Sequence, residues 1–526
     1  MATASGKDWR PEWNNMFAAL REEMDYEITE MQGEIPDDLP AGAFLRNGPG
    51  FFERAGQVIH SIDADGMIAR IEIRNGRATF RNRYIRTKGY EVEEHAGKVM
   101  YRGPYGTTPR HWLLRGAFNT VTKNTGNTSL VYLPKQDRLL AGWEGGLPHN
   151  IDPRTLETRG VDTLGHLTDN RDIVTAHPRI CPETGRLWSF GAYSGKSSKV
   201  KVREYDLSGA DPVLLQEHTI RLTGAAVIHD CLLTPNWFII IHNPVRIHLP
   251  KLALGYGIDD FLLPDPGAVS TAYLLPRRQD QLAPAPEPAG SADKSKKPGP
   301  TSRYATVRLA PGFSYHHVNA GEDDQGIWFD TIEYARKPPL NMQDTSPVSN
   351  AMSAAGESGP GLLTRFRAAP PVQAGAVPGV VEPIRLPGPG SMEMPVIAPD
   401  LTGRSHRFVF GVRTTADRNY KGGVAPWTAI AKTDLATGKV TYWEPTPRCF
   451  VGEPAFVPRA NPAEEDDGYL LTLCFDGVAK QSTLRILDAK DLRECCALVL
   501  KRPVPFSFHC CWIPASEYDC APAARL

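Results

Sequence analysis

The chain has 526 residues, with 59 lysines and arginines against 60 aspartates and glutamates, so its formal net charge is −1. This balance argues against a nucleic-acid-binding protein, because such proteins usually carry a basic excess, and we expect no nucleic-acid partner. The 47 glycines and 46 prolines favour a fold of many short strands joined by turns.

The nine cysteines do not predict a disulfide framework. Their number is odd, and the two adjacent pairs, Cys495-Cys496 and Cys510-Cys511, have poor geometry for ordinary disulfides. The N-terminus lacks a hydrophobic signal core, and no run reaches the ~18 apolar residues of a membrane span. We therefore expect a reducing, cytoplasmic location. The end of the chain, Ala524-Arg525-Leu526, loosely resembles a peroxisomal tail.

The first predicted element is an amphipathic helix within residues 8–30, where apolar residues stand at helical spacing: Trp13, Met16, Phe17 and Leu20. Residues 69–85 predict a hairpin, because alternating residues flank Asn75-Gly76, the pair best suited to a type I′ turn. Further strand-like runs lie at 129–134, 138–144, 186–194, 237–243, 326–334, 406–412, 438–445, 469–477 and 483–489.

Many short strands at fairly regular spacing indicate an all-β sandwich, barrel or propeller. No change in composition marks a domain boundary, so the length favours a single propeller domain over residues 1–526. Residues 281–303 and 353–380 are rich in Pro, Ala, Gly and Ser, and they predict flexible insertions in loops.

Four of the fourteen histidines share one setting, at the start or end of a strand-like run and beside turn residues: His177, His229, His316 and His509. In a propeller, strand ends from different blades converge near the axis, so these distant side chains can meet there. Their spacings match no local metal motif, and a hydrogen-bonded structural histidine is the commoner alternative for each. His316 and its neighbour His317 should face opposite sides of a strand.

The stretches around these histidines, together with FLRNGPG (44–50), HSIDADGMI (60–68), LLAGWEGGLPHNIDPRTLET (139–158) and VGEPAFVPR (451–459), closely resemble the carotenoid cleavage oxygenase family. The match follows the family's order from about residue 35 to 514. The resemblance implies an all-β, seven-bladed propeller with a loop and helix cap over the axial face that binds iron.

The resemblance also implies a set of site residues around Fe(II). The ligands would be the four histidines above, with His317 structural. Three glutamates would accept hydrogen bonds from His229, His316 and His509 in that order: Glu144, Glu393 and Glu453. Imidazole nitrogen suits Fe(II), four neutral ligands leave positions for O2, and the carboxylates would fix the histidine tautomers. Thr128 matches a small residue near the open iron position.

Members of this family cleave a conjugated carbon–carbon double bond with O2 to give two aldehydes or ketones. Aromatic residues near the motifs are expected to line an apolar tunnel, with ordinary core packing as the alternative: Trp143, Phe313, Tyr315, Phe506, Phe508 and Trp512. Stilbene-cleaving relatives tend to carry a lysine where this chain has Trp143. The sequence therefore favours an apocarotenoid or carotenoid substrate, with stilbenoid cleavage and retinoid isomerisation as alternatives.

Such polyenes dissolve in membranes, so we expect peripheral membrane contact. Residues 249–267 mix large apolar side chains with flanking Arg246, His248 and Lys251, as an interfacial segment does. A loop packed against the protein is the alternative for this segment.

Overall fold

The computed structural model describes residues 10–112, 122–168, 171–195, 198–265, 268–278, 282, 303–338, 340, 358–371, 374–414 and 426–519. The tail that resembles a peroxisomal signal lies outside these residues, as does nearly all of the insertion predicted at 281–303.

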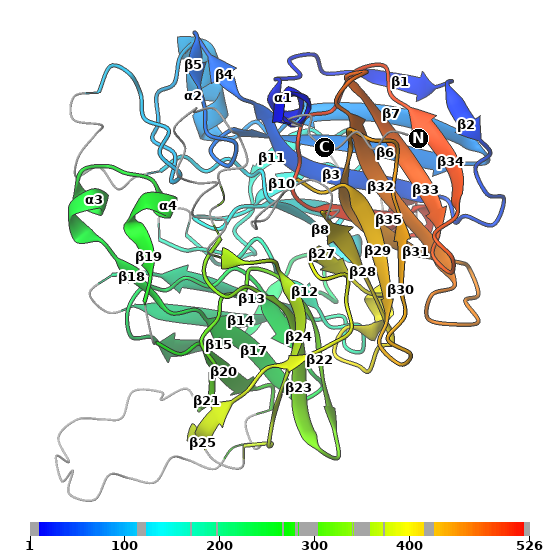
Figure 1. Ribbon diagram of the computed structural model, residues 1–526. Helices are drawn as coiled ribbons and strands as arrows, with labels where there is room; N and C mark the ends of the chain where they lie inside the picture. Colours follow the sequence, from blue (N-terminus) through cyan, green and yellow to red (C-terminus); the bar gives the residue numbers. More distant parts are fainter. Residues whose placement is uncertain are drawn as a thin grey trace, which may run out of the picture.

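Seven sheets of four or five strands surround one axis and form the predicted seven-bladed β-propeller (Figure 1). The first three blades, each given from its innermost strand outward, are β35 (Cys510–Pro514), β3 (Gly42–Phe51), β6 (Asp65–Arg74), β7 (Arg77–Tyr84) and β1 (Asp25–Ile28); β8 (Ser129–Leu133), β9 (Arg138–Gly142), β10 (His149–Ile151) and β11 (Thr158–Val161); and β12 (Arg179–Ile180), β13 (Leu187–Tyr193), β14 (Lys199–Asp206) and β15 (Val213–Arg221).

The remaining blades are β16 (Cys231–Leu233), β17 (Trp237–His242), β20 (Thr271–Pro276), β21 (Ala305–Leu309) and β25 (Gly375–Val381); β22 (His317–Asp323), β23 (Gly326–Glu333), β24 (Leu362–Ala368) and β26 (Ile384–Arg385); β27 (Glu393–Val396), β28 (Phe408–Arg413), β29 (Ala429–Asp434) and β30 (Val440–Trp443); and β31 (Cys449–Pro458), β32 (Gly468–Asp476), β33 (Gln481–Asp488), β34 (Glu494–Val499) and β2 (Met31–Gly33).

Short helices and two small sheets complete the described elements. The helices are α1 (Arg10–Asn14), η1 (Asn15–Phe17), α2 (Lys88–Ala96), η3 (Pro134–Gln136), α3 (Leu249–Ala253), α4 (Ile258–Phe261), η4 (Pro399–Leu401) and α6 (Ala515–Asp519). The small sheets are β4 (Glu53–Arg54) with β5 (Gln57–Val58), and β18 (Val245–Ile247) with β19 (Leu262–Pro264).

The core lies between adjacent blades, which explains why many strands are buried on both faces. All six residues of β17 are buried. Ile239 and Ile241 pack toward the fifth blade, whereas Phe238 and Ile240 pack toward the third. Because successive strand residues face opposite sides, a continuous apolar run fills the two interfaces of one blade at once.

The ring closes through strands from both ends of the chain. The last strand, β35, pairs with β3 in the first blade, and β2 pairs with β34 in the seventh. Arg46 of β3 is buried at this closure and donates to Ser507 Oγ and to the carbonyl oxygens of Ser507, Phe508 and Glu453. One side chain therefore holds together the first blade, the seventh blade and the segment that leads into β35.

The hairpin and the strand-like runs predicted from sequence are confirmed, and Asn75-Gly76 has the positive φ values of a type I′ turn. The predicted helix within 8–30 is wrong in extent, because helical structure ends at Phe17 and residues 25–28 pair with β7 at a sheet edge. The prediction of a flexible insertion over 353–380 is wrong for β24, which lies between β23 and β26 in the fifth blade. Its alternating residues LLTRFRA stand within Gly- and Pro-rich sequence that obscured the pattern.

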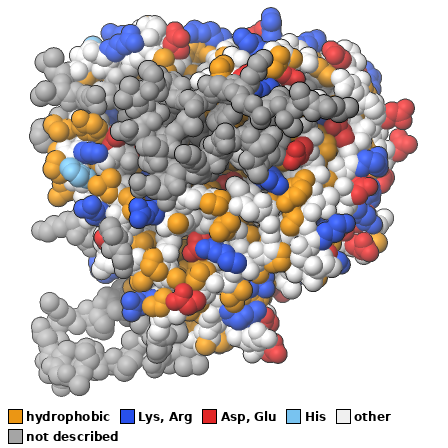
Figure 2. All heavy atoms as spheres, viewed as in Figure 1, with side chains coloured by type: hydrophobic (Ala, Val, Ile, Leu, Met, Phe, Trp, Pro, Cys, Tyr) orange, Lys and Arg blue, Asp and Glu red, His pale blue; other side chains and the backbone are white. Residues whose placement is uncertain are grey.

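A cap of α3, α4 and the β18–β19 pair lies beside the propeller (Figure 1). Hydrophobic side chains gather at the same edge of the molecule in Figure 2. Leu249 and Leu254 expose 68% and 52% of their surface there. Among the described residues, no helix is long and apolar enough to cross a membrane. Contact of residues 249–267 with a membrane surface stays a prediction.

Replacing Arg46 by Met should lower the free energy of unfolding by roughly 2–4 kcal/mol, because buried carbonyl oxygens lose their donor. Thermal and denaturant unfolding measure this loss. The matched control is Arg77→Met on β7, where the guanidinium is 73% exposed and pairs with Glu27 at the surface. Equal stability of the two variants would contradict the structural role assigned to Arg46.

Candidate metal centre and its cavity

The four predicted histidines lie one or two residues before the innermost strands of four blades. His177 precedes β12, His229 precedes β16, His316 precedes β22 and His509 precedes β35. One ring nitrogen from each lies within 4.8 Å of the others, which is close enough to hold one metal ion. The predicted convergence of these side chains at the axis is therefore confirmed.

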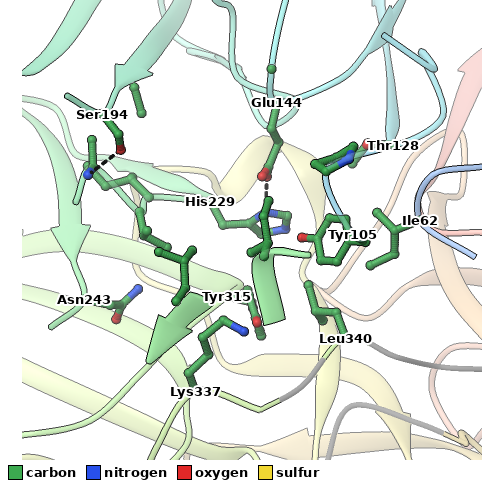
Figure 3. Close-up of a pocket in the computed structure, with 18 of the residues that line it drawn as sticks. Ile62, Tyr105, Thr128, Glu144, Ser194, His229, Asn243, Tyr315, Lys337 and Leu340 are labelled. Carbon is green, nitrogen blue, oxygen red and sulfur yellow. Dashed lines mark hydrogen bonds and ion pairs between the residues drawn. The ribbon is translucent and has the colours of Figure 1, made fainter. Parts of the chain in front are cut away.

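Three carboxylates contact three of the histidines in the pairs that the family resemblance implies. The Nδ1 of His316 lies 2.6 Å from Glu393 Oε2, and the Nδ1 of His509 lies 3.0 Å from Glu453 Oε1. The Nδ1 of His229 contacts Glu144, as Figure 3 shows. No carboxylate of the described residues forms an ion pair with His177, the fourth histidine.

These contacts determine which ring nitrogens carry lone pairs. A carboxylate accepts a hydrogen bond from Nδ1–H, so the Nε2 atoms of His229, His316 and His509 are left as acceptors. The Nε2 atoms of His229 and His316 are 3.0 Å apart. Two lone pairs at that distance repel each other unless a cation lies between them. The Nε2 of His177 is buried and has no hydrogen-bond partner among the described residues.

The electrostatics keep Glu393 and Glu453 ionised. Burial raises the pKa of Glu393, but His316, the Tyr334 hydroxyl and the Met394 N–H outweigh burial and bring the net pKa below its usual value. The pKa of Glu453 is also lowered, since His509, Arg46 and the Cys510 N–H outweigh its burial. These anions suit a dication at the axis.

The histidine pKa values follow from burial and from the same neighbours. Burial, reinforced by the other histidines, places the pKa of His177 well below its usual value. Burial also lowers the pKa of His509 despite Glu453. For His316 the Glu393 carboxylate outweighs burial, and the pKa is raised. Three of the histidines thus differ in basicity because of the groups that face them.

His317 stands apart from the cluster, as predicted. Its Nδ1 lies 2.8 Å from the hydroxyl of Thr331, the residue opposite it on β23. Burial lowers the pKa of His317 to about 4, so the ring is neutral. Its backbone N–H donates to Asp230, which also pairs with Arg179. His317 therefore packs the fifth blade against its neighbour.

A cavity of about 460 Å³ opens onto this cluster and contains most of the predicted tunnel residues. Its lining includes Trp143, Phe313, Tyr315 and Phe508, and Thr128, which directly precedes β8 (Figure 3). The Thr128 hydroxyl donates to Asn127 Oδ1 at 3.2 Å. The structure thus brings Thr128 and four of the six aromatic residues to one apolar chamber beside the histidines.

Two aromatic predictions are wrong. Phe506 is 1% exposed, and its ring packs on Trp13, Phe17 and Trp427 in the core. The N-terminal helix occupies that space, and its position could not be inferred from the local sequence. Trp512 packs in the apolar cluster between the first and seventh blades.

The sequence analysis did not single out six further lining residues: Ile62, Arg102, Tyr105, Lys337, Leu340 and Met394. Met394 lies on β27, and the other five stand on loops outside the histidine motifs. The cap also contributes Leu252, Ile258 and Phe261, whose apolar side chains were noted only as an interfacial segment. Lys337 and Arg102 show that the cavity has cationic side chains although position 143 is a tryptophan.

Comparison with known proteins shows relatives that match nearly the whole chain. The family described as retinal pigment epithelial membrane protein matches residues 17–514. The apocarotenoid-15,15′-oxygenase of Synechocystis is 32% identical, over 97% of this chain and 98% of that protein. The isoeugenol monooxygenase of Pseudomonas nitroreducens is 29% identical, over 96% of this chain and 98% of that protein. The resveratrol cleavage oxygenase 1 of Botryotinia fuckeliana is 26% identical, over 87% of this chain and 77% of that protein.

Solved structures agree with the fold. A crystal structure of an ACO/RPE65 chimera superposes with a TM-score of 0.82 at 31% identity, covering 97% of this chain and all of that one. Cobalt-substituted Synechocystis ACO gives a TM-score of 0.81 at 32% identity, over 96% of this chain and 99% of that one. The cobalt-substituted form shows that this neighbour binds a metal.

The adjacent histidines give a sharp test of the cluster. Replacing His316 by Ala should reduce bound metal to background, because one of the four nitrogens is lost. His317→Ala should retain metal, since its ring contacts Thr331. Metal analysis after anaerobic loading with Fe(II) makes the comparison. Loss of metal from the His317 variant alone would reverse the assignment.

Replacing one of the three carboxylates should reduce metal binding and turnover less than replacing one of the four histidines. Glu453→Gln removes the anion behind His509 and should lower metal affinity or turnover by roughly 10–100-fold, the usual effect of losing such a partner. Glu464→Gln, on the loop between β31 and β32, is the control because that side chain is 68% exposed. Unchanged metal affinity and turnover in Glu453→Gln would remove Glu453 from the site.

Proposed function

The chain belongs to the family of the retinal pigment epithelial membrane protein and the carotenoid cleavage oxygenases, and we propose that it is a non-haem Fe(II) dioxygenase. It cleaves one conjugated carbon–carbon double bond of an apocarotenoid or carotenoid. One O2 is consumed, each carbon of the bond receives one oxygen atom, and two aldehydes or ketones are released. The observation that carries this proposal is the apolar cavity lined by His229, His316 and His509, three of the four clustered histidines.

The donor set fits Fe(II). Four neutral imidazole nitrogens suit a divalent transition metal, and fewer than six ligands leave positions for a small molecule. The orphaned Nε2 of His177 and the close Nε2 atoms of His229 and His316 both call for a cation. When bound, the iron would supply the activation of O2 that a spin-forbidden reaction with an alkene requires.

The protein's own residues would bind, orient and shield the substrate. Trp143, Phe313 and Phe508 offer apolar area, and burial of a polyene against them is worth roughly 25 cal/mol per Å². Glu144, Glu393 and Glu453 hold three imidazoles in one tautomer. Thr128 presents a small side chain where a larger one would fill the chamber beside the histidines.

A phenolic stilbene is the second candidate substrate. Its support is the presence of Lys337, Arg102 and Tyr105 in the lining, which could contact a phenol. Against it, Trp143 directly precedes Glu144 and supplies apolar area instead of a cation. The apocarotenoid oxygenase is also the more similar relative, at 32% against 26% identity for the resveratrol-cleaving one. Retinoid isomerisation is a third candidate, supported by the family alone.

A panel of substrates tests the proposal. The iron-loaded protein should consume O2 and release two carbonyl products from a long apocarotenoid, with faster turnover than on resveratrol. Oxygen uptake and product analysis by mass spectrometry measure both. Trp143→Lys should shift the ratio toward phenolic stilbenes, because it adds a charged donor to the chamber.

The control for this panel is the His316→Ala protein under the same conditions, which should give no products. Efficient cleavage of resveratrol, with no polyene cleaved, would replace the first candidate by the second. Conversion of a retinoid without O2 uptake would favour isomerisation.

A further inference from the structure

The cavity contains a lysine that the proposed chemistry does not use. Lys337 follows β23 and lines the apolar chamber beside Leu340 and Tyr315. Its side chain is only 6% exposed. In Figure 3 it extends from the chain toward the middle of the cavity. A buried ammonium in an apolar chamber needs partners for its N–H groups, because unpaired buried charge is costly.

Asp259 of the cap supplies one of those partners. Its Oδ1 accepts from Lys337 Nζ at 2.5 Å, and its Oδ2 accepts from the backbone N–H of Leu340 at 2.7 Å. The aspartate therefore joins α4 to the segment after β23, and the ion pair is neutral overall. An ammonium has three N–H donors, and within the described chain Asp259 is the only group that bonds Nζ.

Three other polar side chains of the lining are already engaged by the protein. Ser194 Oγ accepts from the N–H of Ala226. Asn243 both donates to and accepts from the backbone of Ser314. Glu144 contacts His229. Lys337 differs from these three side chains. Among the described residues its ammonium has one partner, Asp259, which leaves two of its N–H donors available to the chamber.

We propose that Lys337 binds an uncharged oxygen at one end of the substrate, a hydroxyl or an aldehyde carbonyl; this inference rests on the proposed function. The oxygen would accept a hydrogen bond from the ammonium while the hydrocarbon chain contacts the aromatic lining. A carboxylate end is disfavoured at Lys337, since Asp259 already neutralises this ammonium. Lys337 thereby selects oxygenated apocarotenoids over hydrocarbons.

Equilibrium binding tests this selection without turnover. The iron-loaded protein, kept anaerobic, is titrated with an apocarotenal, the alcohol and acid derived from it, and the hydrocarbon with a methyl group in place of the aldehyde. Quenching of tryptophan fluorescence reports binding. The aldehyde and alcohol should bind roughly tenfold more tightly than the hydrocarbon and the acid, as for one hydrogen bond to a charged group.

Lys337→Met should abolish this preference and leave the affinity for the hydrocarbon and the bound iron unchanged. Lys439→Met, at an exposed turn before β30, is the matched control and should behave as the unmodified protein. Asp259→Asn breaks the ion pair but keeps the lysine, so it should keep a preference for the oxygenated ligands.

Two results would overturn the inference. One is equal weakening of all four ligands in Lys337→Met and Asp259→Asn, which would show that the ion pair only holds the cap. The other is tightest binding of the acid by the unmodified protein. Oxygen uptake on the same ligands is scored separately, so failure to cleave any polyene would reject the proposed function and leave the binding result intact.

Discussion

Imidazole lone pairs that converge on the propeller axis are the constraint on which the rest of the structure depends. The Nδ1–H groups of His229, His316 and His509 donate to carboxylates, so their Nε2 atoms face the axis as lone pairs without a proton between them. A divalent cation turns this repulsion into coordination. The buried, ionised Glu393 and Glu453 complete the balance, because each of these two anions has a histidine on one side and other hydrogen-bond donors on the other.

The propeller supplies this arrangement because each blade begins at the axis. Every innermost strand contributes one side chain of the site. Six of these lie at or beside the first residues of their strand, and Glu453 lies in the middle of β31: Thr128, His177, His229, His316, Glu393, Glu453 and His509. Residues separated by hundreds of positions thus become neighbours without any long loop having to reach the site. Closure of the ring matters for the same reason. Arg46 links the first and seventh blades at the point where the chain enters β35.

The strands and the histidine and glutamate positions could be predicted from the sequence, because they follow from local patterns or from family motifs. Alternation and the Asn75-Gly76 turn located the strands, and the motifs located the histidines with their glutamates. Packing between distant segments could not be predicted, because no local pattern in the sequence records it. Phe506 meets the N-terminal helix in the core, and Lys337 reaches the cavity from a loop without a motif. Strand β24 was obscured by Gly- and Pro-rich neighbours, although it lies inside a blade.

The cavity links the metal centre to substrate selection, since apolar walls, a cap and an ion-paired lysine all border the same histidines. All of these roles require a metal at the axis. Anomalous diffraction at the iron edge, from crystals of the Fe(II)-loaded protein grown without O2, tests that requirement most directly. The account predicts one peak per chain within bonding distance of the Nε2 atoms of His177, His229, His316 and His509. Loaded crystals with no peak at the axis, or with the metal held elsewhere, would contradict it.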